Sequence, residues 1–298
     1  MKKALFYGIL ASLFFAFTFV LNRSMNLSGG YWLWSACLRY LFTLPLLWLL
    51  TAKKGGTAGI RKEIRSHAFS WLLWSTVGFG FFYVPLTLAS VYGESWFVAA
   101  TWQLTIVAGI LLTPLFGKKL PIKNLLWSGV ILGGIFLLQT SHFASANWKG
   151  MLFSLGLILI AAFSYPLGNR KMMACCPQEI TTLQRVFGMT LCSMPFWLIL
   201  SLYALATHGL PSPGQTAQSL VVAAFSGVAA TVLFFAGTDL TRHDPKQLAV
   251  VEATQSGEVI FALLGGILFL GDPLPSPLGF AGISIIVIGM IGNSLASA

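Results

Sequence analysis

The sequence predicts an all-α integral membrane protein with ten transmembrane helices. Ten apolar stretches fill the chain, its lysines and arginines gather on alternate loops, and 56% of its residues are hydrophobic against 9% charged. Each stretch is close to the ~20 residues that an α-helix needs to cross a hydrocarbon core. A water-soluble domain of 298 residues would need more polar surface than this composition supplies.

Hydropathy places the helices, and the loops between them are short. None of these loops is long enough for a soluble domain, so any function has to lie among the helices or on their loops. The ten predicted spans are residues 4–22, 31–51, 68–91, 94–116, 123–141, 149–168, 181–206, 217–238, 247–270 and 277–296.

The basic residues predict how these helices are oriented. If the N-terminus is inside, all but four of the 18 lysines and arginines fall on cytoplasmic segments; Arg23 and Lys149 fall outside, and Arg39 and Arg185 lie within spans. Basic residues concentrate on cytoplasmic loops, so both termini are predicted to be cytoplasmic. The same sidedness accounts for the net charge of +10, and no nucleic-acid partner is expected.

Two sequence motifs recur and divide the chain into halves. Asn22-Arg23-Ser24-Met25 at the end of the first span returns 147 residues later as Asn169-Arg170-Lys171-Met172. Residues 115–121 close the fourth span, and residues 269–275 close the ninth in a similar way, at an offset of 154. The nearly equal offsets predict two five-helix repeats, residues 1–146 and 147–298.

The odd number of helices in each half determines how the halves face. A second set of five helices enters the membrane with the opposite orientation from the first, so the repeat is predicted to be inverted. Inverted repeats are typical of transporters that alternate between two conformations, with the substrate site near the midplane where the halves meet.

Residues of the ninth and tenth spans carry a resemblance to a known family. A run in span 9 begins Gln255-Ser256-Gly257-Glu258 and extends to Gly271-Asp272, just past the end of the span, and three glycines follow in the tenth span, Gly279, Gly282 and Gly289. Over its whole length the chain resembles the drug/metabolite transporter superfamily, of the EamA-like ten-helix type. The family pattern has Glu-Pro and then Gly-Glu, whereas this chain has Val259 and Asp272 at the second position of each pair. The first span, which ends Asn22-Arg23-x-Met25, is similar to the multidrug resistance efflux branch.

The resemblance implies a secondary transporter that exports small organic solutes, drugs or metabolites, across a bacterial cytoplasmic membrane by alternating access. The expected partners are the lipid bilayer and a small organic solute, with a proton as a candidate coupling ion, and no cofactor is implied. An amino-acid or other metabolite exporter or uniporter of the same fold is the first alternative, and a non-transporting subunit or channel is the second. The solute, coupling ion, direction and oligomeric state stay open.

An intramembrane enzyme is not predicted, because the residues that its chemistry needs are not in place. The chain has no His-Glu-x-x-His motif, no paired aspartates at membrane depth and no Walker-type glycine loop. Its vicinal cysteines, Cys175 and Cys176, have no neighbouring His or further Cys, which makes them a poor metal site.

Five ionisable residues lie within predicted spans, where charge is costly and usually functional or paired. Arg39 and Glu94 belong to the outer half of the membrane, while Arg185 and Glu252 lie near the cytoplasmic face. We expect two related ion pairs, which either stabilise the helices or break and reform as gates.

The fifth of these residues, Glu258, is the deepest. It lies about 16 Å into the membrane at 1.5 Å per residue, near the centre of a core roughly 30 Å thick. An unpaired carboxyl there can bind and release protons, which suits proton-coupled export of a cationic solute. The alternative is an acid that only holds helices together, with Gln255 and Thr254 on its face as hydrogen-bond partners.

Aromatic and polar residues within the spans are candidates for lining a solute site. Aromatic rings can bind planar or cationic solutes, and an amide can add a polar contact. The candidates are Trp74, Tyr83, Trp96, Trp102, Gln103 and Tyr165. Small residues have a packing role instead: Gly129 and Gly133 form a G-x-x-x-G, and Gly282, Gly289 and Gly292 recur in span 10, which predicts a close helix–helix seam within the monomer or between monomers.

Overall fold

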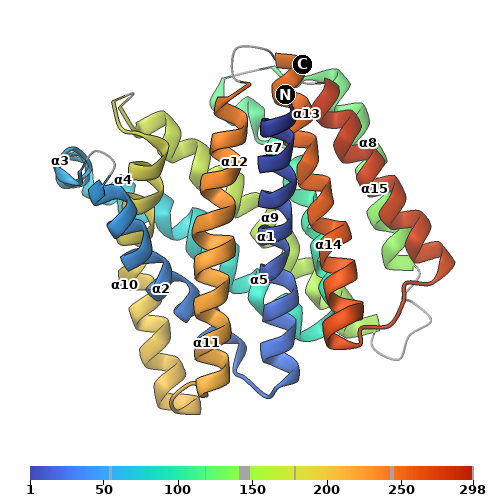
Figure 1. The fold of residues 1–298 in the computed structure, drawn as a ribbon, viewed down its shortest axis with the longest axis horizontal. Coiled ribbons are helices and arrows are strands. Elements are labelled where there is room, and N and C mark those ends of the chain that lie inside the picture. Colours follow the sequence, from blue (N-terminus) through green and yellow to red (C-terminus); the bar gives the residue numbers. More distant parts are fainter. Residues whose placement is uncertain (54–55, 118, 141–147, 178, 242–244, 297–298) are drawn as a thin grey trace.

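The computed structural model is a bundle of long helices (Figure 1). It describes residues 1–298 except 54–55, 118, 141–147, 178, 242–244 and 297–298. Within the described ranges every regular element is helical, and nine helices are long and apolar enough to cross a membrane. This is the architecture of a helical integral membrane protein, as the composition predicts.

The helices of the first half follow one another with short connections. In chain order they are α1 (Lys2–Leu27), α2 (Trp32–Lys53), α3 (Ala58–Ser66), α4 (Ala68–Ser75), η1 (Thr76–Gly80), α5 (Phe81–Tyr92), α6 (Ser95–Trp102), α7 (Leu104–Leu111), η2 (Thr113–Phe116) and α8 (Ile122–Thr140).

The residues of the predicted second half form a similar series of long and interrupted helices. Its elements are α9 (Trp148–Cys175), α10 (Thr182–His208), α11 (Pro213–Val222), η3 (Ala223–Ala229), α12 (Ala230–Asp239), α13 (Pro245–Ala253), η4 (Thr254–Ser256), α14 (Gly257–Gly265), η5 (Gly266–Leu270) and α15 (Pro277–Ala296).

Nine of the predicted spans correspond to these nine long helices, and the exception is 94–116. There the chain is interrupted at Gln103, which ends α6 and begins α7, and the apolar helix from Ser95 to Leu111 is shorter than the others. A 3-10 turn containing Pro114 follows, because proline cannot continue the α-helical hydrogen bonding. Helix α3 was not predicted, since it is short and polar.

The two halves pack against each other reciprocally. Helix α1 contacts α12 and α14 of the second half, and α9, the first helix of the second half, contacts α5 and α7 of the first. The second helices of the halves, α2 and α10, also pack together, as do the last ones, α8 and α15. Figure 1 shows α8 and α15 side by side along the right edge of the bundle.

On α15 the seam with α8 uses the predicted glycines, Gly282, Gly289 and Gly292, whereas on α8 it uses Gly134 in place of the predicted Gly129 and Gly133. A Cβ atom added to Gly282 would lie 2.9 Å from the carbonyl oxygen of Gly134, and one added to Gly134 would lie 2.9 Å from the carbonyl oxygen of Gly282. Gly129 and Gly133 instead have open space around them, so their G-x-x-x-G is outside the seam. Because helix residues advance by ~100° each, Gly134 lies on a different face from Gly133. The seam is within the monomer.

A second close approach, between α9 and the π-helical turn η1, supports a stability prediction. A Cβ atom at Gly168 would collide with the backbone of Gly78 and lie 2.8 Å from the carbonyl oxygen of Trp74. We therefore expect Gly168→Val to destabilise the protein by about 1–3 kcal/mol or more, because backbone atoms have no room to move. Thermal unfolding of detergent-purified protein measures this loss of stability. Gly133→Val is the control, because Gly133 has open space around it. Equal melting temperatures for the two variants would contradict the prediction.

Candidate functional site

Arg39 of α2 lies at the junction of three helical segments. Its Nη1 donates to Thr18 Oγ1 of α1 at 3.3 Å, and its Nη2 donates to Ser226 Oγ of η3 at 3.4 Å. The guanidinium carbon is 4.1 Å from the ring centroid of Tyr83 on α5, a cation–π contact. The hydroxyls of Thr18 and Ser226 are themselves hydrogen bonded at 2.5 Å. Arg39 therefore connects both halves of the chain.

Tyr83 is held rigidly beneath this arginine. Its ring is fully buried, and its hydroxyl accepts a hydrogen bond from Asn22 Nδ2 at 3.1 Å. Tyr40, the residue after Arg39, packs 5.6 Å from Tyr83 between ring centroids and stacks on Trp197 at 4.4 Å. These aromatic contacts fix the ring on which Arg39 rests.

Glu258 and Tyr165 complete the group around Arg39. Glu258, in the first turn of α14, interacts electrostatically with Arg39 and with Tyr165 of α9. The Tyr165 ring lies 4.8 Å from Phe82 and 5.7 Å from Trp102, yet 39% of the residue is accessible. Arg39 and Glu258 are also partly accessible.

We call the charged and polar members of this group the central cluster. Because residues from six different helical segments interact and three of them are partly accessible, the cluster offers a polar surface inside the bundle that a solute could contact. It consists of Thr18, Arg39, Tyr83, Tyr165, Ser226 and Glu258.

The structure brings together some of the predicted lining residues and separates others. Tyr83 and Tyr165 belong to the central cluster, and Trp102 packs against Tyr165. Trp74 instead lies 5.6 Å from the Lys171 ammonium, measured to the ring centroid. Trp96 is 1% exposed near the start of α6.

The two predicted amide side chains, Gln103 and Gln255, differ in their hydrogen bonding. Gln103 is buried at the break between α6 and α7, and its Nε2 donates to the Ala99 carbonyl of its own chain segment at 3.0 Å. The Nε2 of Gln255 is buried without a hydrogen-bond partner in the described part of the chain. Thr254 donates to the Val251 carbonyl at 2.6 Å, so neither predicted partner of Glu258 bonds to it.

The predicted ion pairs are not formed in this structure. Where residues are described, the ion pairs within 4.0 Å are Arg23–Asp272 and His67–Glu63. Arg39 turns toward Tyr83, while Glu94 precedes α6 and leaves its Oε2 buried without a hydrogen bond. Arg185 and Glu252 are also apart, because α10 packs on α2 and α4 whereas α13 packs on α1 and α15.

Arg185 lies instead near Cys176, in the loop after α9. Burial raises the pKa of the Cys176 thiol, against the attraction of the Arg185 guanidinium. The thiol is thus neutral at physiological pH and unreactive compared with a thiolate. Among the described residues no group of three or more His, Cys, Asp or Glu side chains could hold a metal ion.

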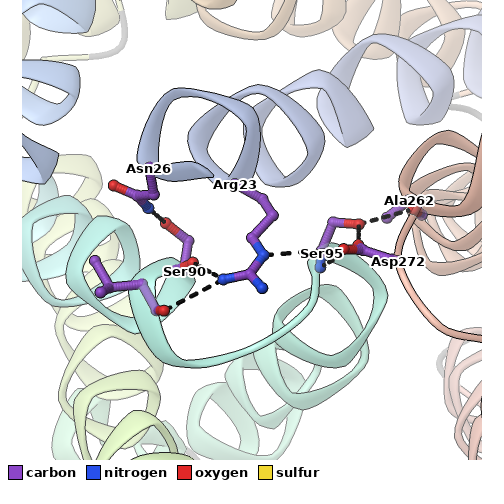
Figure 2. Close-up of polar contacts among 7 residues, drawn as sticks. Arg23, Asn26, Ser90, Ser95, Ala262 and Asp272 are labelled. Atoms are coloured by element: carbon purple, nitrogen blue, oxygen red, sulfur yellow. Dashed lines mark hydrogen bonds and ion pairs between the residues drawn. The ribbon is translucent and has the colours of Figure 1, made fainter. Parts of the chain in front are cut away.

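A second polar group, shown in Figure 2, joins the halves at the end of the bundle where α1 ends and α6 begins. Asp272, just after η5, accepts hydrogen bonds at its Oδ2 from Ser95 Oγ at 2.7 Å and from the Ser95 backbone N–H at 3.1 Å. Its Oδ1 lies 3.9 Å from Arg23 Nε of α1. We call Arg23, Ser95 and Asp272 the Asp272 cluster.

Each charge of the Asp272 cluster lies at a helix end of opposite polarity. Asp272 caps the N-terminus of α6, where unpaired N–H groups carry partial positive charge. Arg23 Nη1 donates to the carbonyls of Val91 and Ser90 at the C-terminal end of α5, at 3.2 and 3.4 Å. Gly271, at φ +67°, makes the left-handed turn that delivers Asp272 to this position.

The repeat predicts a counterpart at the opposite end of the bundle, and its chemistry differs. Arg170 corresponds to Arg23 and donates from Nη1 to the Gly109 carbonyl of α7 at 2.5 Å. The residue that corresponds to Asp272 is Lys118, which lies outside the described residues. At the position in the first half that corresponds to Asp272, the sequence therefore has a basic residue instead of an acidic one.

Comparison with known proteins identifies the family of this chain. A family model described as "EmrE: Putative multidrug resistance efflux transporter" matches residues 2–298. The chain belongs to this family. The EmrE family is one of efflux transporters, which confirms the resemblance found in the sequence and sets the chain in a transporter family, not an enzyme family.

Relatives of the chain are similar over most of their lengths. It is 51% identical over 308 residues to the uncharacterized protein YjlA of Bacillus subtilis strain 168, covering 99% of the chain and 95% of YjlA. It is 46% identical to an uncharacterized 42.1 kDa protein of Shouchella clausii, covering 86% of the chain and 70% of that protein. A solved crystal structure of another protein shares the fold, with a TM-score of 0.66 at 12% identity over 100% of the chain and 98% of that structure.

Proposed function

We propose that this protein is a secondary transporter that exports small organic solutes through the bacterial cytoplasmic membrane by alternating access. The observation that carries the proposal is the central cluster, in which charged and aromatic residues of both halves meet inside a membrane-spanning bundle. Charged side chains within membrane spans are costly and usually mark a transport pathway. Membership of an efflux family supports the outward direction.

Ten spans in two inverted repeats are part of this proposal, with both termini cytoplasmic. Support comes from the reciprocal packing of α1 and α9 on the opposite halves. The fourth spans of the halves also end alike, with left-handed glycines at Gly117 (φ +71°) and Gly271 (φ +67°). The start of α1 and the end of α15 lie toward the same end of the bundle, as an even number of crossings requires (Figure 1). Helices α6 and α7 together would form the tenth span.

Alternating access needs an outer closure that can break, and the Asp272 cluster has the chemistry for one. With cytoplasmic termini, the end of α1 and the start of α6 lie on the outer side. Asp272 then ties the outer ends of the two halves together through Ser95 and Arg23. Water can replace these hydrogen bonds and ionic contacts when the outer side opens, so their net strength is modest.

Proton coupling through Glu258 is the last part of the proposal. Glu258 is the acid of the central cluster, and no described side chain donates a hydrogen bond to it. A proton bound there and a cationic group of the solute would compete for the same carboxylate, as exchange of one for the other requires. The groups that influence it electrostatically are Arg39 and Tyr165.

Counterflow in proteoliposomes tests the transport function. Vesicles loaded with one unlabelled compound and diluted into its radiolabelled form are expected to accumulate label transiently above equilibrium. Tetraphenylphosphonium, L-phenylalanine, L-lysine and uridine serve as probes, chosen after a thermal-shift screen of the purified protein. A channel equilibrates the label without an overshoot, and a structural subunit admits none, so either result would overturn the proposal.

A further inference from the structure

We propose that Arg39 binds a carboxylate of the transported solute, so that the protein exports acid-bearing compounds in preference to simple cations. This inference rests on the proposed transport function and names the class of its substrate. The starting observation is that a guanidinium lies among membrane-spanning helices with no carboxylate in an ion pair with it among the described residues.

The hydrogen bonds of Arg39 leave most of its binding capacity unused. A guanidinium has five N–H donors in a planar fork and stays charged in proteins. Arg39 gives one each to the hydroxyls of Thr18 and Ser226, at the long distances of 3.3 and 3.4 Å, and both acceptors are neutral. A carboxylate matches the fork with two parallel bonds, which are shorter and about twice as strong as neutral ones.

The surroundings orient the guanidinium for such a partner. One face of the guanidinium lies over the Tyr83 ring, 4.1 Å from its centroid, and Asn22 holds that tyrosine in place. The edge that carries the N–H groups is therefore presented in a fixed plane. Thr18 and Ser226, which now bond each other at 2.5 Å, are donors as well as acceptors and could turn to the same carboxylate.

The charge of the remaining cluster agrees with an acid-bearing solute. Glu258 and Arg39 interact and carry opposite charges when both are ionised, so the cluster then has no net charge. A simple cation would nevertheless meet repulsion from Arg39. A solute with both a carboxylate and a cationic group would satisfy Arg39 and Glu258 together. The accessible ring of Tyr165, which packs on the buried rings of Phe82 and Trp102 within 5.7 Å, offers a contact for the solute's apolar body.

Matched pairs of probes that differ only in a carboxylate test this inference. The pairs are L-phenylalanine with phenethylamine, L-tryptophan with tryptamine, and L-lysine with cadaverine, and tetraphenylphosphonium is the cation without an acid. In binding measurements on purified full-length protein, the acid-bearing member of at least one pair is expected to bind about tenfold or more tightly than its amine. The same member should show counterflow.

Variants of Arg39 separate a direct contact from a structural role. Arg39→Gln is expected to weaken binding of the acid-bearing member about tenfold or more, while its amine binds as tightly as before or more tightly, because the repulsion from Arg39 is gone. Arg39→Lys keeps the charge but not the fork and should fall between the two. Melting temperature and gel-filtration profile show whether each variant is folded. If Arg39→Gln does not fold, the inference is tested by Arg39→Lys and by whether the wild-type protein binds the acid-bearing member of each pair more tightly than its amine.

The outcomes distinguish this inference from the transport function. Tighter binding of the amines than of the acid-bearing members by the wild type, or equal loss of both members of a pair in folded Arg39→Gln, overturns it. If tetraphenylphosphonium shows counterflow and no acid-bearing probe does, the protein is a transporter and the substrate class is wrong. If no probe shows counterflow, the proposed function fails and this inference with it.

Discussion

Glu258→Gln is expected to abolish the dependence of transport on a proton gradient while exchange of solute continues. Glutamine keeps the size and the hydrogen-bonding oxygen of the side chain, but it cannot take up or release a proton. Gradient-driven transport should fall about tenfold or more, the usual scale for losing a proton-transfer group. Counterflow needs no net proton movement and should persist, with weaker binding of any solute whose cationic group contacts Glu258.

Proteoliposomes with an imposed pH gradient measure this effect, with a pH-sensitive dye inside to report proton movement. The matched control is Glu252→Gln, because Glu252 is an exposed acid on the same span and outside the central cluster. Unchanged pH dependence in Glu258→Gln would assign this carboxyl to helix packing. Equal losses of gradient-driven transport in both variants would show that removing either negative charge has the same effect, and that Glu258 has no specific role in proton coupling.

Asp272→Ala is expected to loosen the end of the bundle where α1 ends and α6 begins. The change removes the acceptor of both Ser95 hydrogen bonds and leaves Arg23 without its carboxylate. Losing a helix cap costs about 1 kcal/mol, and an unpaired charge that stays partly buried adds to this, so the N-terminal turn of α6 should open more often. Transport rates should change as well, because an outer closure that is easier to break shifts the balance between the two conformations.

Hydrogen–deuterium exchange of the first turn of α6 is the measurement for this variant. We expect at least about fivefold faster exchange, which corresponds to roughly 1 kcal/mol of lost protection. Glu94→Gln is the control, since Glu94 stands directly before α6 but makes no side-chain hydrogen bond to its N-terminus. Faster exchange in Glu94→Gln, with none in Asp272→Ala, would mean that Asp272 does not cap this helix.

The positions of the helices could be predicted because the bilayer imposes a length and a polarity on each span. The predicted span 277–296 coincides with α15, and most other spans differ from their helices mainly at the ends. Helices α1 and α9 continue beyond their apolar runs, to Leu27 and Cys175, because backbone hydrogen bonding does not depend on side-chain polarity. The span 94–116 is the least accurate, since the break at Gln103 does not show in hydropathy.

The candidate site was predictable in its residue types and less so in its contacts. Glu258, Arg39 and Tyr83 could be selected as charged or aromatic groups at membrane depth, and the structure brings them together. The pairing of Arg39 with Glu94 was inferred from shared depth alone, and depth does not determine the direction in which a side chain points around its helix.

The Asp272 cluster shows most clearly what was missed. In the sequence, Arg23 stands in the repeated motif and Asp272 at the end of the ninth span. Nothing in the sequence indicated that Asp272 caps α6, because residues 95 and 272 are 177 positions apart. The sequence does contain one signal: on the side predicted to be outer, Asp272 has few basic partners other than Arg23.

Composition, hydropathy and loop charge by themselves determined that the chain is a helical membrane protein. A bilayer requires each span to be apolar and to satisfy its own backbone hydrogen bonds, so this constraint can be recognised in each local stretch of sequence. The repeated motifs and the family resemblance, which are also read from the sequence alone, added the transporter class. Only the tertiary structure decided which charges meet, which glycine of α8 forms the seam and which acid links the end of α1 to the start of α6. These are relations between distant helix faces, and they depend on how each helix is rotated against its neighbours when the bundle packs.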